Sequence, residues 1–215
     1  MKLLILGASG GIGGWLVKLA IERGHEVTAL VRNAARLDAP PRVTIMRGEA
    51  ADQTTVSHAV RGHDVVISAV GQRRTSFSPW ATILSPHDIV EQVTRNLIAA
   101  MPIAGVRRLV FVSAGGVGDS VRYCTRPIRW MITRPRLRIA YADIARAEEA
   151  AASSSLDWLA VRPVTLAPFE VARRAREVKR YGLFSSIGRK AVAEWMLDVV
   201  ELPNPYVQRT VLLGA

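Results

Sequence analysis

The sequence predicts an α/β fold: one domain over residues 1–215, built as a doubly wound parallel sheet with helices on both faces. Short apolar runs alternate with longer amphipathic stretches along the chain, as in strands joined by crossover helices. The first run, KLLIL at 2–6, is apolar without alternation, as in a strand covered on both faces. Such sheets bind ligands at the carboxyl ends of their strands, so functional residues are expected there.

A helix is expected directly after the first strand. Apolar residues recur at helical spacing between Ile12 and Arg23, and Gly24 ends the pattern. Asp52 is a suitable N-cap for the next helix. The same alternation predicts strands at 26–31, 43–48, 64–71, 107–116, 156–163 and 208–213, and helices at 52–60, 88–104, 141–155 and 189–201. The basic run at 173–180 is expected to be an exposed helix face.

Composition excludes several classes of protein. Cys124 is the only cysteine, which excludes an intramolecular disulfide and a cysteine metal cluster. The four histidines are scattered, so no metal site is expected. Glycines and charges follow the first apolar run, which argues against a signal sequence or membrane span. A single cysteine suits a reducing interior, so the cytoplasm is the expected location. The net charge of +11 predicts an anionic ligand or partner, but no motif for specific nucleic-acid binding accompanies it.

Gly7, Gly10 and Gly13 lie at the junction of the first strand and the first helix. They give the pattern G-x-x-G-x-x-G in LGASGGIGG. Glycines at these spacings allow a tight turn, close approach to a phosphate, and helix amides that point at an anion. Helix–strand packing alone would also use them, but the strand–turn–helix context favours a dinucleotide bound by a Rossmann βαβ unit. The expected contacts are Gly7, Ser9, Gly10, Gly11, Ile12 and Gly13.

The end of the second strand bears on the choice of cofactor. An acid there binds the ribose 2′-hydroxyl of NAD(H), whereas an arginine pairs with the 2′-phosphate of NADP(H). In ALVRNAAR, Arg32 lies at the strand end with Asn33 beside it and Arg36 one turn on, and no acid precedes Asp38. A solvated arginine is the simpler interpretation, but the guanidinium fork matches a phosphate. We therefore expect NADP(H) in preference to NAD(H).

A basic segment is expected to form a loop or lid at about 118–140, between the fifth strand and the following helix. Six arginines occur from 122 to 138, with no acid between Asp119 and Asp143. One interpretation is that they bind substrate carboxylates or phosphates, since loops at this edge often carry function. A solvated face, an acidic partner and a membrane surface are the alternatives, the last because Trp130 and its neighbours interleave with arginines. The sequence leaves these alternatives open. It also does not determine the oligomeric state.

Several stretches, taken in order, carry a family resemblance. They are LGASGGIG at 6–13, LVRNAARL at 30–37, DVVISAVGQRR at 64–74, VRRLVFVSAGGVG at 106–118, AEEAAASSSLDWLAVRP at 147–163 and IGRKAVAEWMLDVVE at 187–201. The chain resembles the atypical short-chain dehydrogenase/reductases, in the single-domain NAD(P)-binding group that includes flavin and biliverdin-IXβ reductases and NmrA-like proteins. The resemblance covers nearly the whole chain.

The resemblance also implies roles for residues after the later strands. It implies that Asp52 and Gln53 lie by the adenine. It implies that Ser113 stands beside the nicotinamide as a hydrogen-bond donor, although a serine before two glycines also suits a simple turn. The residues implied to pass the cofactor ribose and pyrophosphate are Ala69, Val70 and Gly71, with Arg73 and Arg74 as further candidates.

The catalytic pair of the wider superfamily is incomplete. Its members use a tyrosine and, four residues on, a lysine that lowers the pKa of the tyrosine. Tyr141 has the corresponding place, but Ala145 stands where the lysine is expected, and Arg146 points to another side of the helix. Tyr141 is therefore either a catalytic group without its partner or a packed aromatic residue.

Hydride transfer without a positioned acid suits an acceptor that delocalises the incoming electrons. A flavin, a quinone and a linear tetrapyrrole are such acceptors, and solvent completes the protonation. We therefore predict an NADPH-dependent reductase of a small-molecule electron acceptor, with Ser113 and Tyr141 as candidate catalytic residues. An NmrA-like protein that senses the NADP redox state without turnover is the alternative. An epimerase or dehydratase would need the tyrosine chemistry and is less favoured.

Overall fold

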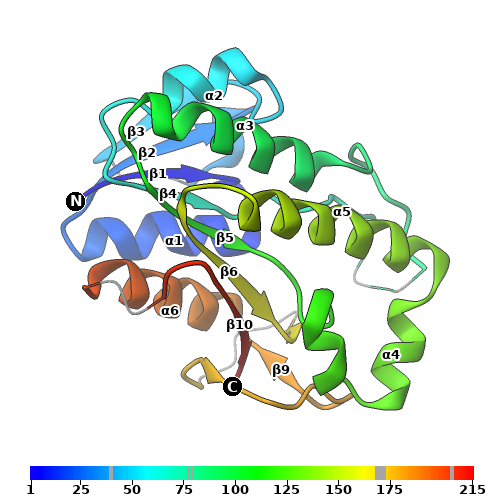
Figure 1. Cartoon of the computed structure of the whole chain (residues 1–215). Helices are drawn as coiled ribbons and strands as arrows, with labels where there is room; N and C mark the ends of the chain where they lie inside the picture. Colours follow the sequence, from blue (N-terminus) through cyan, green and yellow to red (C-terminus); the bar gives the residue numbers. More distant parts are fainter. Residues whose placement is uncertain (39–40, 77, 79, 168–172, 204–205) are drawn as a thin grey trace.

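The computed structural model describes residues 1–38, 41–76, 78, 80–167, 173–203 and 206–215 (Figure 1). Within these residues the main sheet has eight strands in the order β3-β2-β1-β4-β5-β6-β10-β8. Neighbouring strands are parallel except β10 and β8. The order of the first six strands is that of the Rossmann fold. The predicted fold class is therefore confirmed.

The elements have the following bounds. The strands of the main sheet are β1 (Lys2–Leu6), β2 (Glu26–Val31), β3 (Val43–Arg47), β4 (Val65–Ser68), β5 (Arg108–Val112), β6 (Asp157–Pro163), β8 (Arg176–Glu177) and β10 (Arg209–Gly214). A small second sheet pairs β7 (Thr165–Leu166) with β9 (Ser186–Ile187). The helices are α1 (Gly11–Glu22), α2 (Gln53–Ala59), α3 (Ile89–Ile103), α4 (Arg126–Ile132), α5 (Pro135–Ala152) and α6 (Arg189–Glu201), with 3₁₀ helices η1 (Ala34–Arg36) and η2 (Gly118–Tyr123).

Helices cover the main sheet on both faces. α1 and α6 pack together on one face, and α2, α3 and α5 lie on the other (Figure 1). Leu3 and Ile5 of β1 belong to the core under α1 and α6, whereas Leu4 and Leu6 belong to the core on the opposite face. Successive side chains of a strand point to opposite faces. Both faces of β1 are therefore buried, which explains the unbroken apolar run.

Two predictions about the second half of the chain were wrong. Residues 118–140 are largely helical rather than a loop: they form η2, α4 and the first turn of α5, which starts at Pro135. Proline suits the first helical position because its missing N–H needs no partner there. The basic run at 173–180 contains β8 rather than a helix face. β8 pairs with the end of β10, where Gly214 leaves room for Val178 to pack closely against the backbone.

Candidate functional site

The candidate site lies where the strand order reverses, between β1 and β4. The helices that follow these two strands cover opposite faces, and at such a point this fold binds ligands in a crevice outside the carboxyl ends of the strands. Gly7 follows β1, and a Cβ on it would lie 2.7 Å from the carbonyl carbon of Ala69, which follows β4. The N–H of Ala69 in turn donates to the carbonyl of Leu6 at 2.9 Å. The structure thus brings the predicted glycine turn against residues 69–70.

The glycine turn depends on the absence of side chains. Gly7 has a φ of +75°, in the left-handed region. Its carbonyl accepts a hydrogen bond from the N–H of Gly10 at 2.9 Å. A Cβ on Gly13 would collide with the same carbonyl. The first turn of α1 therefore packs directly on the end of β1.

The start of α1 is suited to an anion. Among the described side chains none caps this helix, and its first turn holds no acid. The N–H groups of Gly11, Ile12 and Gly13 precede the first intrahelical bonds and carry the positive end of the helix dipole. Ser9, Gly10 and Gly11 are exposed. These residues fit a dinucleotide pyrophosphate, which would take the hydrogen bonds that the helix leaves unused.

Arg189 is a candidate that the sequence analysis did not single out. It opens α6, and its side chain lies over the glycine turn: a Cβ on Gly11 would be 2.5 Å from Cδ and 2.7 Å from Nε of Arg189. Its Nη1 donates to the carbonyl of Ala167. A cation in the first turn of a helix is disfavoured by the helix dipole. The unfavourable position of Arg189 and Lys190 at the start of a helix therefore indicated a functional role that the sequence alone could have suggested.

Arg32 directly follows β2, and its side chain is exposed. The register of β1 and β2 puts it level with the glycine turn. The neighbouring Asn33 caps η1, since its Oδ1 accepts from the N–H of Ala35 at 3.0 Å. The side chain of Arg36, also expected here, lies outside the part of the chain that the structure describes. Of the predicted side chains that the structure describes at this strand end, Arg32 is thus exposed and level with the turn, whereas Asn33 serves as a cap.

Asp52 and Gln53 hold local structure after β3. Asp52 caps α2 as predicted, because its Oδ2 accepts from the N–H of Thr55 at 2.7 Å and from its hydroxyl at 2.6 Å. These hydrogen bonds lower the pKa of Asp52. The Gln53 amide donates to the hydroxyl of Ser57 and to the carbonyl of Asn96 on α3. An adenine contact from either residue stays a prediction.

The residues after β4 lead away from the glycine turn along the crevice. Gly71 and Arg73 are exposed. Gln72 donates to the carboxylate of Asp143 at 3.1 Å, and this buried carboxylate also accepts from the N–H groups that open α3, those of Val90 and Glu91. Asp143, which the sequence analysis did not assign, thus fixes the start of α3 and the chain that leaves β4.

Ser113, after β5, belongs to a buried chain of polar groups. Its hydroxyl donates to Oε1 of Glu148 at 2.5 Å. Two further bonds to this carboxylate come from Arg162, at 2.8 Å from Nε and 2.6 Å from Nη2. The third guanidinium nitrogen binds Asp119 at 2.6 Å and lowers the pKa of that carboxyl. Because a serine hydroxyl has one hydrogen, Ser113 in this arrangement meets a ligand as an acceptor, not as the predicted donor.

Tyr141 lies near Ser113 but is held as a neutral phenol. Its hydroxyl donates to the carbonyl of Gly115 at 3.1 Å. Burial raises its pKa far above the ordinary value, and the opposing effect of Arg74 is smaller. Arg146 cannot serve in place of the missing lysine, since its guanidinium pairs with Glu91 on α3. The geometry therefore favours a packing role for Tyr141, and its catalytic assignment stays a prediction.

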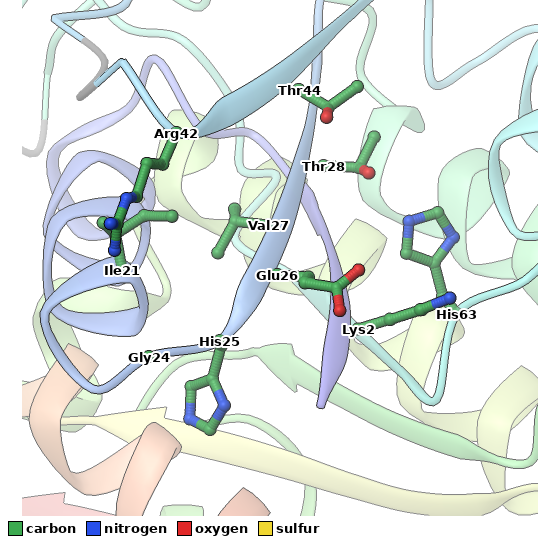
Figure 2. Close-up of a pocket in the computed structure, with 10 residues that line it drawn as sticks. All are labelled: Lys2, Ile21, Gly24, His25, Glu26, Val27, Thr28, Arg42, Thr44 and His63. Carbon is green, nitrogen blue, oxygen red and sulfur yellow. The ribbon is translucent and has the colours of Figure 1, made fainter.

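A separate cavity of about 300 Å³ lies at the amino ends of β1 and β2 (Figure 2). Its lining includes Lys2 and Glu26, the first residues of β1 and β2, together with His25 and His63. His25 pairs with Glu201 at 2.8 Å. The amino ends of parallel strands face away from the ligand edge of this fold, so this cavity is not part of the cofactor crevice.

Comparison with known proteins agrees with this geometry. The model of a family described as NAD(P)H-binding matches residues 7–203. The chain belongs to this NAD(P)H-binding family. The match includes the glycine turn, Arg32 and the start of α6, so the predicted resemblance to atypical short-chain dehydrogenase/reductases is confirmed at the level of the cofactor-binding family.

Curated relatives of this NAD(P)H-binding protein are longer than the chain. A 3-diazoavenalumate denitrifying reductase of Streptomyces is 32% identical over 173 residues, 77% of this chain and 56% of its own length. A 2-alkyl-3-oxoalkanoate reductase of Stenotrophomonas maltophilia is 35% identical over 122 residues, 54% of this chain and 34% of its own length. The chain thus spans from a third to about half of these two relatives.

Solved structures share the fold over nearly the whole chain. An anaerobillin reductase of Escherichia coli O157:H7 superposes with a TM-score of 0.77 at 22% identity, covering 99% of this chain and 96% of its own. A short-chain dehydrogenase/reductase of Veillonella parvula, solved with NADP, superposes with a TM-score of 0.78 at 17% identity, covering 100% and 94%. At these identities the likeness shows the fold alone.

Proposed function

We propose that the chain is an NADPH-dependent reductase that passes a hydride to a delocalised acceptor: a flavin, a quinone or a linear tetrapyrrole. The observation that carries the proposal is a contrast between two sides of the site. The first turn of α1 is uncapped and open to an anion, whereas Ser113 and Tyr141, the candidate acids on the acceptor side among the described residues, already donate their hydrogens within the protein. The reductase names among the relatives support it.

Two arginines support cofactor binding, and one of them supports the preference for NADPH. Arg32 is level with the glycine turn and exposed, where a guanidinium would pair with a 2′-phosphate. Arg189 lies over Gly11, where it would meet the pyrophosphate common to both nicotinamide cofactors. Arg32 would therefore select between the cofactors, and Arg189 would strengthen the binding of either.

The groups at the acceptor side support an acceptor that needs no protein acid. The hydrogen of Ser113 is taken by Glu148, and Tyr141 is a weak acid that is bonded to a backbone carbonyl. When bound, the nicotinamide would supply the hydride, two electrons with one proton. The acceptor spreads that charge over its conjugated system and takes the second proton from water. The protein's part is orientation, with Ser113 accepting a hydrogen bond from the cofactor amide or the acceptor.

The test is NADPH oxidation by the purified full chain, followed by the loss of nicotinamide absorbance. The panel holds flavin mononucleotide, a soluble quinone, biliverdin and, as a contrast, a simple aldehyde and ketone. We expect oxidation with one of the three conjugated acceptors and none with the carbonyl compounds. Tight NADPH binding without oxidation by any conjugated acceptor contradicts the proposal.

A redox sensor without turnover is the second candidate, in the manner of NmrA-like proteins. It is favoured by the raised pKa of Tyr141 and by Ala145 in place of the superfamily lysine. A sensor must bind the oxidised and reduced cofactors differently and change its affinity for a partner. Titration with NADP and NADPH separates the candidates, because a sensor requires unequal binding and the absence of turnover.

A further inference from the structure

Exposed apolar side chains are concentrated on three segments of the chain. Of eleven large exposed apolar side chains among the described residues, six lie within 80–84, 121–130 and 183–184. Trp130 is 56% exposed and Phe184 is 100% exposed. We call the following set the basic–aromatic surface: Trp80, Leu84, Val121, Trp130, Leu183 and Phe184, with Arg122, Arg126, Arg129, Arg134, Arg136 and Arg138.

Contacts join the segments of this surface. Nη1 of Arg136, in the first turn of α5, donates to the carbonyl of Trp80. The guanidinium carbon of Arg134, which precedes α5, lies 3.7 Å from the centre of the Trp130 ring on α4. Trp80 and Trp130 are thus linked through the short connection between α4 and α5. The cation–π contact holds an arginine against an exposed aromatic ring, so charge and apolar area lie together.

The third segment adjoins the start of α4. The N–H of Thr125, just before α4, donates to the carbonyl of Tyr181 at 2.8 Å, two residues before Leu183. Figure 1 shows α4, the start of α5 and β9 at one end of the molecule, beyond the carboxyl ends of β5 and β6. The six apolar side chains therefore belong to one end of the protein rather than to scattered sites.

The charge of the three segments has one sign. Residues 80–84, 120–142 and 183–184 together contain six arginines and no aspartate or glutamate. Five of the six arginines between 122 and 138 are exposed. A surface of this kind is complementary to a dense array of anionic groups.

We propose that the basic–aromatic surface docks the protein on an anionic lipid membrane. Exposed aromatic and aliphatic tips separated by arginines suit the interface of a bilayer, where the tips enter between headgroups and the guanidinium groups pair with lipid phosphates. Nucleic acid would engage the charges but leave Leu183 and Phe184 without a partner. Within the described residues no helix is long and apolar enough to cross a membrane, so the contact would be peripheral.

The docked face lies next to the acceptor side of the crevice. The side chain of Ile132, at the end of α4, packs against Gly116 in the turn that follows β5. The ring of Tyr141 lies against the same glycine. Docking would therefore hold the carboxyl edge of β5 close to the lipid. The inference rests on the surface alone and does not depend on the proposed reductase activity.

The experiment is sedimentation of the full chain with vesicles of phosphatidylcholine alone or mixed with phosphatidylglycerol. We expect binding to the anionic vesicles only, weakening with salt, with a blue shift of tryptophan fluorescence. Arg126→Gln with Arg138→Gln should weaken binding about fivefold per arginine. Trp130→Ser or Phe184→Ser should each weaken it roughly tenfold by loss of apolar burial. Unchanged circular dichroism keeps a folding defect separate from a docking defect.

Matched controls lie outside the surface. Ile103 is an exposed apolar residue at the end of α3, and Arg61 is an exposed arginine after α2, so Ile103→Ser and Arg61→Gln should leave vesicle binding unchanged. No binding to anionic vesicles at low salt overturns the proposal. The proposal is also overturned if Trp130→Ser and Phe184→Ser leave vesicle binding unchanged and the protein binds heparin equally well, because that result indicates general polyanion binding. A dimer dissociated by Phe184→Ser also overturns it, in favour of a subunit interface.

Discussion

The cofactor side and the acceptor side of the crevice are formed by different kinds of groups. On the cofactor side, backbone groups and missing side chains make the site: the carbonyl of Gly7 and the open first turn of α1. On the acceptor side, long-range side-chain contacts make it, with Ser113, Glu148 and Arg162 brought together from a turn, a helix and a strand. The glycine turn of the cofactor side is therefore specified locally, while the acceptor side depends on the whole fold.

Breaking the buried ion pair of the acceptor side should have the largest effect on stability. Glu148→Ala leaves the buried Arg162 without its main partner, which costs about 3–5 kcal/mol. Urea unfolding measures this loss. Glu149→Ala, at an exposed position of the same helix, is the control and should change stability by less than about 0.5 kcal/mol. Equal effects of the two variants would mean that the pair does not hold this side together.

A neighbouring pair of glycines tests the cofactor side. A Cβ on Gly13 would collide with the carbonyl of Gly7, whereas a Cβ on Gly14 would lie 3.7 Å from the carbonyl of Ala8, an ordinary contact. Gly13→Ala should therefore cost about 2–3 kcal/mol and abolish NADPH binding. Gly14→Ala should stabilise by up to about 1 kcal/mol, since alanine favours a helix, and keep binding. Thermal unfolding with and without NADPH measures both. NADPH binding retained by Gly13→Ala contradicts a site built on this turn.

The same contrast explains what the sequence could predict. The alternation of strands and helices, the glycine turn and the Asp52 cap follow from patterns within a few residues of each other, and the structure has them. The bond between Ser113 and Glu148 joins residues 35 apart, and no local pattern encodes it. Arg189 is likewise far from Gly11 in the chain, and only its unfavourable place at a helix start indicated a role. The strand β8 was missed because its pairing with β10 is long-range too.

Arg32 should decide the choice of cofactor. Loss of a charge-assisted hydrogen bond costs about 1.5–3 kcal/mol, so Arg32→Ser should weaken NADPH binding by roughly 10- to 100-fold and leave NADH binding unchanged. Fluorescence titration with both cofactors measures the ratio. Arg61→Ser, at an exposed arginine away from the crevice, is the control. A parallel loss for NADH would assign Arg32 to the shared part of the cofactor.

Replacing Arg189 should weaken the binding of both cofactors, unlike the replacement of Arg32. Because Arg189 lies over the glycine turn, Arg189→Gln should weaken NADPH and NADH alike, by roughly tenfold for one charged contact. The adjacent Lys190 is turned to Glu194 and to the Trp15 ring, so Lys190→Gln should change neither affinity. The same titrations measure this pair. Selective loss of NADPH would place Arg189 at the 2′-phosphate instead.

Replacing Tyr141 should have the smallest effect of these substitutions, and it tests whether the acceptor side supplies a proton. Tyr141→Phe removes one hydrogen bond to Gly115, worth about 1 kcal/mol, and should change turnover less than about threefold between pH 6 and 9. Burial raises the pKa of Tyr141 above its ordinary value of 10.0, so the folded state holds this proton more tightly than the unfolded state. Its contribution to stability is complete below pH 10 and is lost as pH rises beyond it.

The alkaline fall in thermal stability should therefore be shallower in Tyr141→Phe than in the parent chain. Tyr123→Phe is the control, since Tyr123 lies in η2, where its hydroxyl accepts a hydrogen bond from the exposed Arg122. A large loss of turnover in Tyr141→Phe, with a changed pH profile, would make the phenol a catalytic acid despite its burial. The acceptor side would then supply protons as well as orientation. The two sides would still differ in how they are built, by backbone groups at the glycine turn and by long-range side-chain contacts around Ser113.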